Sequence, residues 1–171
     1  MEQLEHYTSS FSRKRFPIVL ILDSISSPAN VGSLFRLADA FGVERIISCG
    51  KQVNLDSPRL KKTARSTSEK VIFEQHTDCL DVCRDYLKKD YSLLALEITS
   101  ASKPLHKLEF SQYQKIALVL GHESVGVRQE VLNLCEKHVH VQMFGKNSSM
   151  NVAQATAIAL YEIAKTLSPI N

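Results

Sequence analysis

Short apolar runs alternate with helical patterns along most of the chain. Continuous runs, the kind found in strands buried on both faces, occupy residues 18–22, 45–48, 71–74, 93–98, 116–120 and 139–141. Apolar residues recur at helical spacing over residues 31–41, 78–89, 127–135 and 152–167. Because the two kinds of segment alternate with short connections, the pattern predicts an α/β fold with a mostly parallel sheet flanked by helices.

Three stretches outside these elements, residues 1–12, 51–68 and 100–114, are expected to be irregular and flexible. A chain of 171 residues suits one domain, so we expect a single domain over residues 1–171 with an N-terminal extension at 1–16. The apolar runs are far shorter than the roughly 20 residues of a membrane-spanning helix. The first twelve residues also lack the apolar core of a signal peptide. These features predict a cytoplasmic protein with no membrane partner.

Cysteine and histidine positions predict no metal site. Cys79 and Cys83 are four residues apart in a predicted helix, without a further Cys or His at zinc-ligand spacing. We interpret the four cysteines of the chain as small buried apolar side chains. His138 and His140 share one face of a predicted strand, but no neighbouring residue completes a set of ligands.

Charge adds a candidate surface for nucleic acid. The net charge is only +3, so composition alone does not indicate a nucleic-acid binder. The basic residues that gather locally are Arg13 and Arg15 before the first strand, and Arg59, Lys61, Lys62 and Arg65 in the second irregular stretch. Such clusters can neutralise backbone phosphates in a salt-dependent way. The alternative is an ordinary solvated basic surface.

The first segment with candidate chemistry follows the strand at 18–22. Pro28 and Asn30 favour a turn, and Asn30 is predicted to cap the helix that holds Gly32 in its first turn. Arg36 follows one turn later on the same face as Gly32. A guanidinium near the carboxyl end of a strand can hold a phosphate or polarise a hydroxyl. Asn30 and Gly32, taken singly, are equally well explained as a cap and a packing residue.

The second segment follows the strand at 116–120. Gly121 permits a tight exit from that strand, Gly126 permits unusual backbone angles, and Glu123 lies between them. The segment lacks the Lys-Ser/Thr ending of a phosphate-binding P-loop and the Gly-x-Ser-x-Gly of a nucleophile elbow. Exposed backbone amides with one carboxylate can cradle a nucleoside.

The third segment leads from the strand at 139–141 into the last helix. Ser149 is placed to be the N-cap of that helix. Two serines and two asparagines within residues 145–151 exceed what capping requires. Met143, Met150 and Val152 can frame an apolar pocket for a purine.

In this order and spacing, the three segments resemble the motifs of the SpoU (TrmH-like) family of RNA ribose 2′-O-methyltransferases, within the SPOUT superfamily. The resemblance extends over about residues 17–167. It implies a SPOUT α/β knot, in which the C-terminal part forms a trefoil knot. It also implies that the protein is an enzyme that binds S-adenosylmethionine in the knot and acts as a homodimer, with the active site assembled at the subunit interface.

The resemblance assigns roles position by position. Arg36 matches the catalytic arginine, which helps to activate the ribose hydroxyl, and Asn30 matches the residue that supports it. Glu123 matches the glutamate that orders the site, while Ser149 and Asn151 match a pair near the cofactor and the arginine. The expected cofactor contacts, mainly from the backbone, are at Leu120, Gly121, Val141, Met143, Ser149 and Met150.

Two departures from the family pattern bear on the substrate: His122 stands where Asn is common, and Gln142 where Pro is common. The compact chain resembles tRNA-acting members, so we expect tRNA as the substrate, gripped by the basic residues at 59–65. The alternatives are an rRNA 2′-O-methyltransferase, a non-catalytic RNA-binding member of the same fold, and a flavodoxin-like or Rossmann nucleotide-binding domain. The last alternative requires a Gly-x-Gly-x-x-Gly after the first strand, and this sequence has none there.

Overall fold

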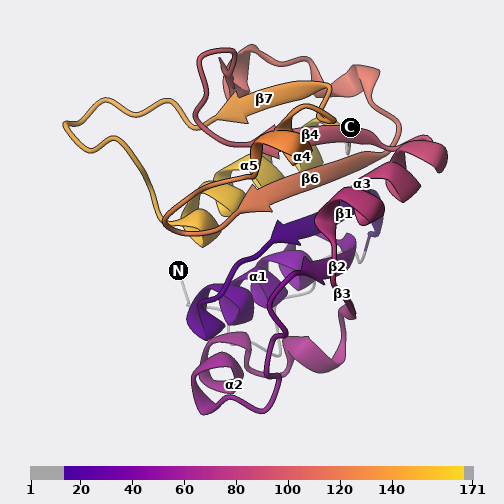
Figure 1. Ribbon diagram of the computed structural model, residues 1–171, viewed down its shortest axis with the longest axis vertical. Helices are drawn as coiled ribbons and strands as arrows, with labels where there is room; N and C mark the ends of the chain where they lie inside the picture. The colour runs from indigo at the N-terminus through magenta and orange to yellow at the C-terminus, as the bar shows by residue number, and fades with distance from the viewer. Residues whose placement is uncertain (1–13, 168–171) are drawn as a thin grey trace, which may run out of the picture.

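In the computed structural model, which describes residues 14–167, seven strands form one sheet in the order β3-β2-β1-β6-β4-β7-β5 (Figure 1). All of the paired strands run parallel. The strands are β1 (Phe16–Asp23), β2 (Val43–Cys49), β3 (Ile72–His76), β4 (Ser92–Leu96), β5 (Lys103–Pro104), β6 (Ile116–Gly121) and β7 (Lys137–His140).

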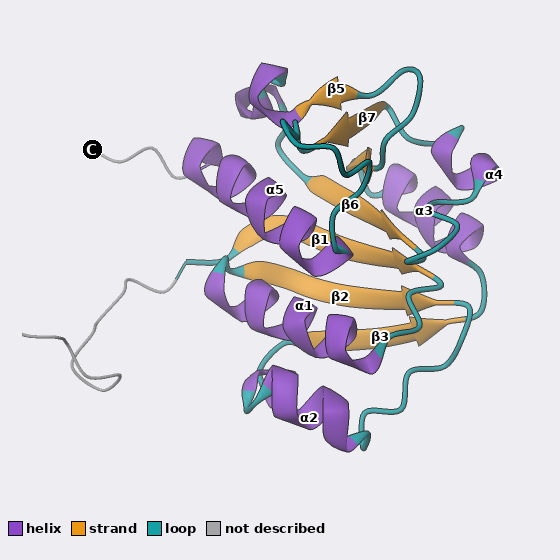
Figure 2. Ribbon diagram, turned by 90° about the vertical axis from the view of Figure 1, so that its left-hand side faces the viewer, coloured by secondary structure: helices purple, strands orange, loops and turns teal. Residues whose placement is uncertain are grey.

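Helices cover both faces of this sheet (Figure 2). On one face lie α1 (Pro28–Ala40), α2 (Pro58–Ala64) and α5 (Val152–Leu167), and on the other lie α3 (Cys79–Lys88) and α4 (Gln129–Leu132). Three single turns of 3-10 helix occupy Thr67–Glu69, Leu105–Lys107 and Phe110–Gln112. The fold is therefore a three-layer α/β sandwich, as the alternating pattern predicts.

The side chains of β1 show why its sequence is apolar throughout. Ile18, Leu20 and Leu22 pack in the layer below α1 and α5, whereas Val19 and Ile21 pack against α3. All five are fully buried, and each contributes roughly 1.5–3 kcal/mol of burial free energy. A strand covered on both faces has no polar face to alternate with.

The order of the strands brings distant segments to one edge of the sheet. The chain proceeds outward from β1 to β3 and returns to β4 on the other side, and β6 then inserts between β1 and β4. The registers pair Asp23 with Gly121, Leu96 with Leu120 and Leu96 with Val139, so the carboxyl ends of four strands are level. Ligands of open α/β sheets bind beyond these ends, where the strand order reverses.

The connection between β7 and α5 is the longest segment at this edge, and Figure 1 shows it reaching away from the sheet.

The six main strands and the four helical segments lie where the sequence pattern predicts them, although the helix expected over 127–135 is reduced to the single turn of α4. The pattern does not predict α2 and β5, which lie in stretches expected to be irregular. β5 has two residues, one of them a proline, and such a strand is tolerated at a sheet edge. Whether residues 1–16 form a separate extension stays a prediction, and residues 1–13 lie outside the described part.

Candidate functional site

The first segment forms the start of α1. Ser27, not Asn30, is the N-cap: its hydroxyl accepts a hydrogen bond from the backbone N–H of Asn30 at 3.4 Å, and Pro28 opens the helix. The prediction that Asn30 caps α1 is therefore wrong. Ser-Pro is a common helix start because proline lacks the N–H that would be left unpaired there. Asn30 lies in the first turn, which leaves its side-chain amide available for other contacts.

Glu123, in the second segment, accepts hydrogen bonds from residues at the start of α1. Its Oε1 accepts from the backbone N–H of Ser27 at 3.1 Å and from Nδ2 of Asn30 at 2.9 Å, and its Oε2 accepts from the N–H of Ser26 at 3.3 Å. Burial opposes ionisation of this carboxyl, but the hydrogen bonds outweigh it and lower the pKa of Glu123. The carboxylate thus fixes the loop after β1 against the loop after β6.

Asn151 links the third segment to the other two. Its Nδ2 donates to Oδ1 of Asn30 at 3.0 Å, and its Oδ1 accepts from the backbone N–H groups of Ala153 and Gln154 at 2.9 and 3.3 Å. Asn151 is therefore the N-cap of α5, and the prediction that Ser149 caps this helix is wrong. Glu123, Asn30 and Asn151 form one hydrogen-bonded chain through the three segments, which we call the Glu–Asn–Asn chain.

Arg36 lies apart from that chain. It is exposed on α1, and it makes no hydrogen bond or ion pair with any of the described residues. It is also not among the residues that line the cavity beside the chain. The structure does not bring Arg36 into contact with the other predicted catalytic residues, so its role stays a prediction.

A cavity of about 610 Å3 opens beside the Glu–Asn–Asn chain, at the level where β4, β6 and β7 end. Of the six residues expected to contact a cofactor, five line it: Gly121, Val141, Met143, Ser149 and Met150. Leu120 does not, because its side chain is fully buried in the core between the sheet and α5. This volume lies within the range of roughly 300–1,000 Å3 that is usual for small-molecule sites.

The loop from Gly121 to Val127 forms one wall of the cavity and allows close backbone packing. His122 and Gly126 exchange two backbone hydrogen bonds, of 3.1 and 2.9 Å. A Cβ on Gly121 would lie 2.2 Å from the backbone of Gly126 and Val127, so residue 121 must be glycine. Gly126 has φ of +73°, a left-handed conformation that favours glycine.

Sequence reasoning missed two polar residues that line the cavity, Glu97 and His140. Glu97 Oε2 accepts from the backbone N–H of Val127 at 3.0 Å, and its Oε1 accepts from that of Ile98. His140 ends β7 and donates to or accepts from the hydroxyl of Ser102 at 2.9 Å. A carboxylate inside the otherwise apolar run at 93–98 was the available indication for Glu97.

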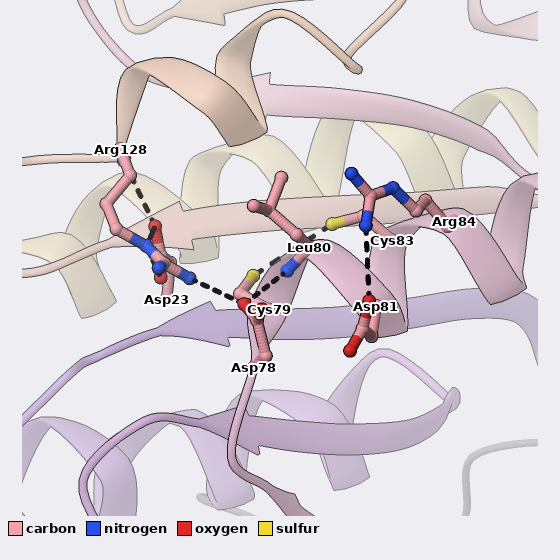
Figure 3. A network of polar contacts seen from close by, with 8 residues as sticks. All are labelled: Asp23, Asp78, Cys79, Leu80, Asp81, Cys83, Arg84 and Arg128. Carbon is pink, nitrogen blue, oxygen red and sulfur yellow. Dashed lines mark hydrogen bonds and ion pairs between the residues drawn. The ribbon is translucent and has the colours of Figure 1, made fainter.

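An ion pair fastens the far end of the Gly121–Val127 loop (Figure 3). The carboxylate of Asp23, at the end of β1, accepts from the backbone N–H and from Nε of Arg128, both at 3.0 Å. Nη2 of Arg128 also reaches Oδ1 of Asp78, the N-cap of α3, at 3.3 Å. The side chain of Asp23 is fully buried, and this burial raises its pKa despite the pairing with Arg128.

Cysteines pack beneath this ion pair. The Sγ atoms of Cys79 and Cys83 are 3.9 Å apart, and both residues are buried on the α3 side of the sheet with Cys49. Hydrogen bonding among these thiols, together with the charge of Arg128, lowers the pKa of Cys79. The interpretation of the cysteines as buried side chains is confirmed for these three, and Cys135 is half-buried.

The basic residues of the second cluster lie on or beside α2, which packs against α1 next to Gly32. Arg59, Lys61, Lys62 and Arg65 are exposed, as is Arg15, and Lys61 pairs with Asp56 at 2.7 Å. Arg13 lies outside the described residues. Within residues 14–167 no group of His, Cys, Asp and Glu is arranged to hold a metal ion, and no helix there has the length and apolar character to cross a membrane.

Comparison with protein families gives a match to the SpoU rRNA Methylase family over residues 17–161. An uncharacterized tRNA/rRNA methyltransferase of Borreliella burgdorferi is 26% identical over 167 residues, which cover 98% of this chain and 72% of that protein. The 23S rRNA (guanosine-2′-O-)-methyltransferase RlmB of Blochmanniella floridana is 32% identical over 149 residues, which cover 87% of this chain and 58% of RlmB. The chain thus spans under two thirds of the RlmB relatives.

Solved structures are similar over most of the chain. The A. aeolicus TrmH/SpoU tRNA modifying enzyme superposes with a TM-score of 0.80 at 21% identity and covers 90% of this chain and 76% of that one. A second structure, which concerns 2-OH methylation of C/U34 on tRNA, has a TM-score of 0.76 at 26% identity. The alignment covers 88% of this chain and 95% of that one.

Proposed function

The chain belongs to the SpoU rRNA Methylase family, and from this membership we propose that it transfers a methyl group from S-adenosylmethionine to a ribose 2′-hydroxyl of RNA. The observation that carries the proposal is the Glu–Asn–Asn chain, which joins three distant segments beside a cavity of suitable size. A structural role alone does not require three polar residues from separate loops to meet at the carboxyl edge of the sheet.

The cavity fits a nucleoside with an amino-acid tail. Val141, Met143 and Met150 supply apolar surface, while Glu97 and Ser149 supply polar groups. These residues would hold S-adenosylmethionine, whose sulfonium supplies an activated methyl group. We infer that the C-terminal part of the fold forms the trefoil knot, with the β7–α5 connection as part of the cofactor site.

Arg36 is proposed as the residue that acts on the ribose. A ribose hydroxyl does not ionise at neutral pH, so as the methyl passes from the sulfonium to the oxygen, the proton passes to an acceptor such as a phosphate oxygen of the RNA or bulk water. A guanidinium is a poor base because its pKa exceeds about 12, which leaves positioning as its main role, through the phosphate of the target nucleotide. The Glu–Asn–Asn chain fixes the start of the helix that carries Arg36.

We propose a homodimer, because Arg36 does not line the cavity of its own subunit. α5 packs beside α1 and leaves Ile158 and Tyr161 exposed by 39% and 58%. A second copy docked on these helices would bring the Arg36 of one subunit to the cavity of the other. Mixing inactive Arg36→Ala and Asn151→Ala proteins would then restore part of the activity in heterodimers, whereas a monomeric site would show no recovery.

The proposed substrate is tRNA. The tRNA-directed structure is covered almost from end to end by this chain, and exposed Arg59, Lys62 and Arg65 offer contacts to phosphates. The second candidate is rRNA, favoured by the 32% identity to RlmB. A cytoplasmic location is proposed with either substrate, since all four cysteines are free thiols.

The proposal is tested by transfer of radiolabelled methyl from S-adenosylmethionine to unmodified tRNA and rRNA, with the product mapped by nuclease digestion. Label on a tRNA ribose is the expected result. Label on rRNA alone would replace tRNA by rRNA. Failure to bind S-adenosylmethionine, with no label on either RNA, would support a non-catalytic RNA-binding protein and contradict the proposed activity.

A further inference from the structure

Two histidines of β7 use their ring nitrogens in different ways. His138 is held on both sides: its Nε2 lies 3.0 Å from the carbonyl oxygen of Leu132, and its Nδ1 lies 2.9 Å from Oγ1 of Thr99. A carbonyl oxygen only accepts, so Nε2 of His138 carries a hydrogen, and its Nδ1 accepts from the Thr99 hydroxyl in the neutral ring. Both nitrogens of His138 are therefore used within the protein.

His140 has one nitrogen that the protein does not use. Its Nδ1 lies 2.9 Å from Oγ of Ser102, a hydroxyl that donates its one hydrogen to the carbonyl oxygen of Thr99 at 2.8 Å. Oγ of Ser102 also accepts a hydrogen bond from the backbone N–H of Thr99 at 3.0 Å. Ser102 must then accept from His140, which places the ring hydrogen on Nδ1 and leaves the lone pair on Nε2.

That lone pair has no hydrogen-bond donor among the described residues, although His140 lines the cavity beside Glu97 and Val141. A half-buried acceptor on the wall of a cavity is available to a ligand that carries a hydrogen-bond donor. The Ser102 hydroxyl holds the ring by its other nitrogen, and this fixes both its tautomer and its orientation.

We propose that Nε2 of His140 accepts a hydrogen bond from the nucleoside half of the bound methyl donor, at an N–H of the adenine or an O–H of the ribose. The inference rests on the proposed function, because it takes the cavity to be the cofactor site. Ser102 acts as a positioning residue that selects the accepting tautomer of His140. His138, two residues away on the same strand, serves no such purpose because both of its nitrogens are engaged.

The first test measures binding of S-adenosylmethionine and S-adenosylhomocysteine by calorimetry. His140→Asn retains an amide near the position of Nδ1 and removes the ring tip, and we expect the dissociation constant to rise about 3- to 10-fold, the equivalent of one hydrogen bond. His140→Gln can present an amide oxygen near the position of Nε2 and should recover part of the affinity. The matched control is His138→Asn, which should bind with unchanged affinity.

Nitrogen NMR of the histidine rings gives an independent readout. In the cofactor-free protein we expect the hydrogen of neutral His140 on Nδ1 and that of His138 on Nε2. In Ser102→Ala the preference of the His140 ring hydrogen for Nδ1 should weaken, and the affinity for S-adenosylmethionine should fall with it. A hydrogen on Nε2 of His140 in the wild-type protein would overturn the proposal.

Analogues identify the donor. S-adenosylhomocysteine analogues that lack the 6-amino group, the 2′-hydroxyl or the 3′-hydroxyl are compared in wild-type and His140→Asn proteins. The analogue that loses affinity for the wild type but not for the variant lacks the donor to His140. Equal affinity of wild type and His140→Asn for both natural ligands would refute the role of His140 and leave the proposed function intact. If the wild-type protein binds neither ligand, the proposed function itself fails, and this inference fails with it.

Discussion

At the scale of single residues, Arg36 and the residues of the Glu–Asn–Asn chain differ in how far they contribute to the stability of the fold. Arg36 is exposed and unpaired among the described residues, so its removal breaks no hydrogen bond or ion pair of the described part of the chain. Glu123 and Asn151 are each hydrogen-bonded to Asn30, so removal of any of the three leaves a partner unsatisfied. The two groups should therefore respond differently to substitution.

Arg36→Ala is expected to abolish methyl transfer and to leave affinity for S-adenosylmethionine within a few-fold of wild type. Arg36→Lys keeps the charge but loses the planar fork of the guanidinium, so it should restore little activity. Single-turnover methylation and calorimetric titration of the two variants measure the two effects. Turnover near the wild-type rate in Arg36→Ala would refute the assigned role.

Asn30→Ala is expected to lower the free energy of unfolding more at neutral pH than in acid. The hydrogen bonds of Glu123 hold its folded pKa below the usual value of 4.5, so its stabilising contribution is complete above that pH and is lost as the pH falls through the folded pKa. Removing one donor raises the folded pKa and reduces that contribution. Urea denaturation at several pH values measures the effect, and in a Glu123→Gln background the pH-dependent part of the loss should disappear.

At the scale of elements, the N-terminus of α5 depends on Asn151. Asn151→Ala is expected to lower the free energy of unfolding by about 0.5–2 kcal/mol, the usual cost of a lost cap. Ser149→Ala should change it by less than about 0.5 kcal/mol. Asn151→Asp keeps the capping oxygen but loses the donor to Asn30, so it should fold stably and lose activity. Thermal and urea denaturation, combined with the methylation assay, distinguish the cap from the site, and a larger loss of stability in Ser149→Ala than in Asn151→Ala would contradict the assignment.

The contact between α1 and α2 depends on Gly32. A Cβ at this position would lie 2.0 Å from Oγ1 of Thr63 and 2.7 Å from the carbonyl oxygen of Leu60. Gly32→Ala should therefore cost about 1–3 kcal/mol in the free energy of unfolding, although alanine is the better helix former. Gly145→Ala is the matched control, because no atom lies within 4 Å of the added methyl. Equal stability of the two variants in urea would show that α2 moves aside.

The sequence predicts those elements whose burial leaves a regular pattern. The strands at 18–22 and 116–120 are apolar throughout because they are covered on both faces. α2 has seven residues, too few to show a helical period, and only Ser57 and Pro58 mark its start. The contact between Asn30 and Asn151 joins residues 121 positions apart and leaves no trace in local spacing, whereas Ser27 and Pro28 are a local indication of the true cap of α1.

At the scale of the whole molecule, the site is assembled by strand order. Glu97 and His140 lie in one cavity with Gly121 because β6, β4 and β7 are neighbours in the sheet, although these residues are far apart in the chain. The motifs predict which segments carry the site and the family predicts that they meet. The additional lining residues follow from the register of non-consecutive strands, which the sequence pattern does not contain.

The Asp23–Arg128 pair joins β1, the loop after β6 and α3, and it makes the stability of the whole fold depend on pH. Burial raises the folded pKa of Asp23 above its usual value of 3.8. The contribution of this carboxyl to stability therefore falls as the pH rises through the interval between the unfolded and the folded pKa. Arg128→Met removes the opposite charge, raises the folded pKa further and extends the interval toward neutral pH. We expect a loss of about 1–3 kcal/mol at neutral pH, less than for a fully buried pair because Arg128 is 44% exposed.

The loss in Arg128→Met should be smaller near pH 5, where more of Asp23 is protonated in the variant, and urea denaturation at the two pH values measures the difference. In Asp23→Asn/Arg128→Met the pH dependence due to this pair should vanish, because no buried carboxyl remains. Since Arg128 follows the loop that forms one wall of the cavity, affinity for S-adenosylmethionine should fall in the single variant as well. An equal loss of stability at both pH values would mean that Arg128 acts through packing of its side chain and not through the charge of Asp23.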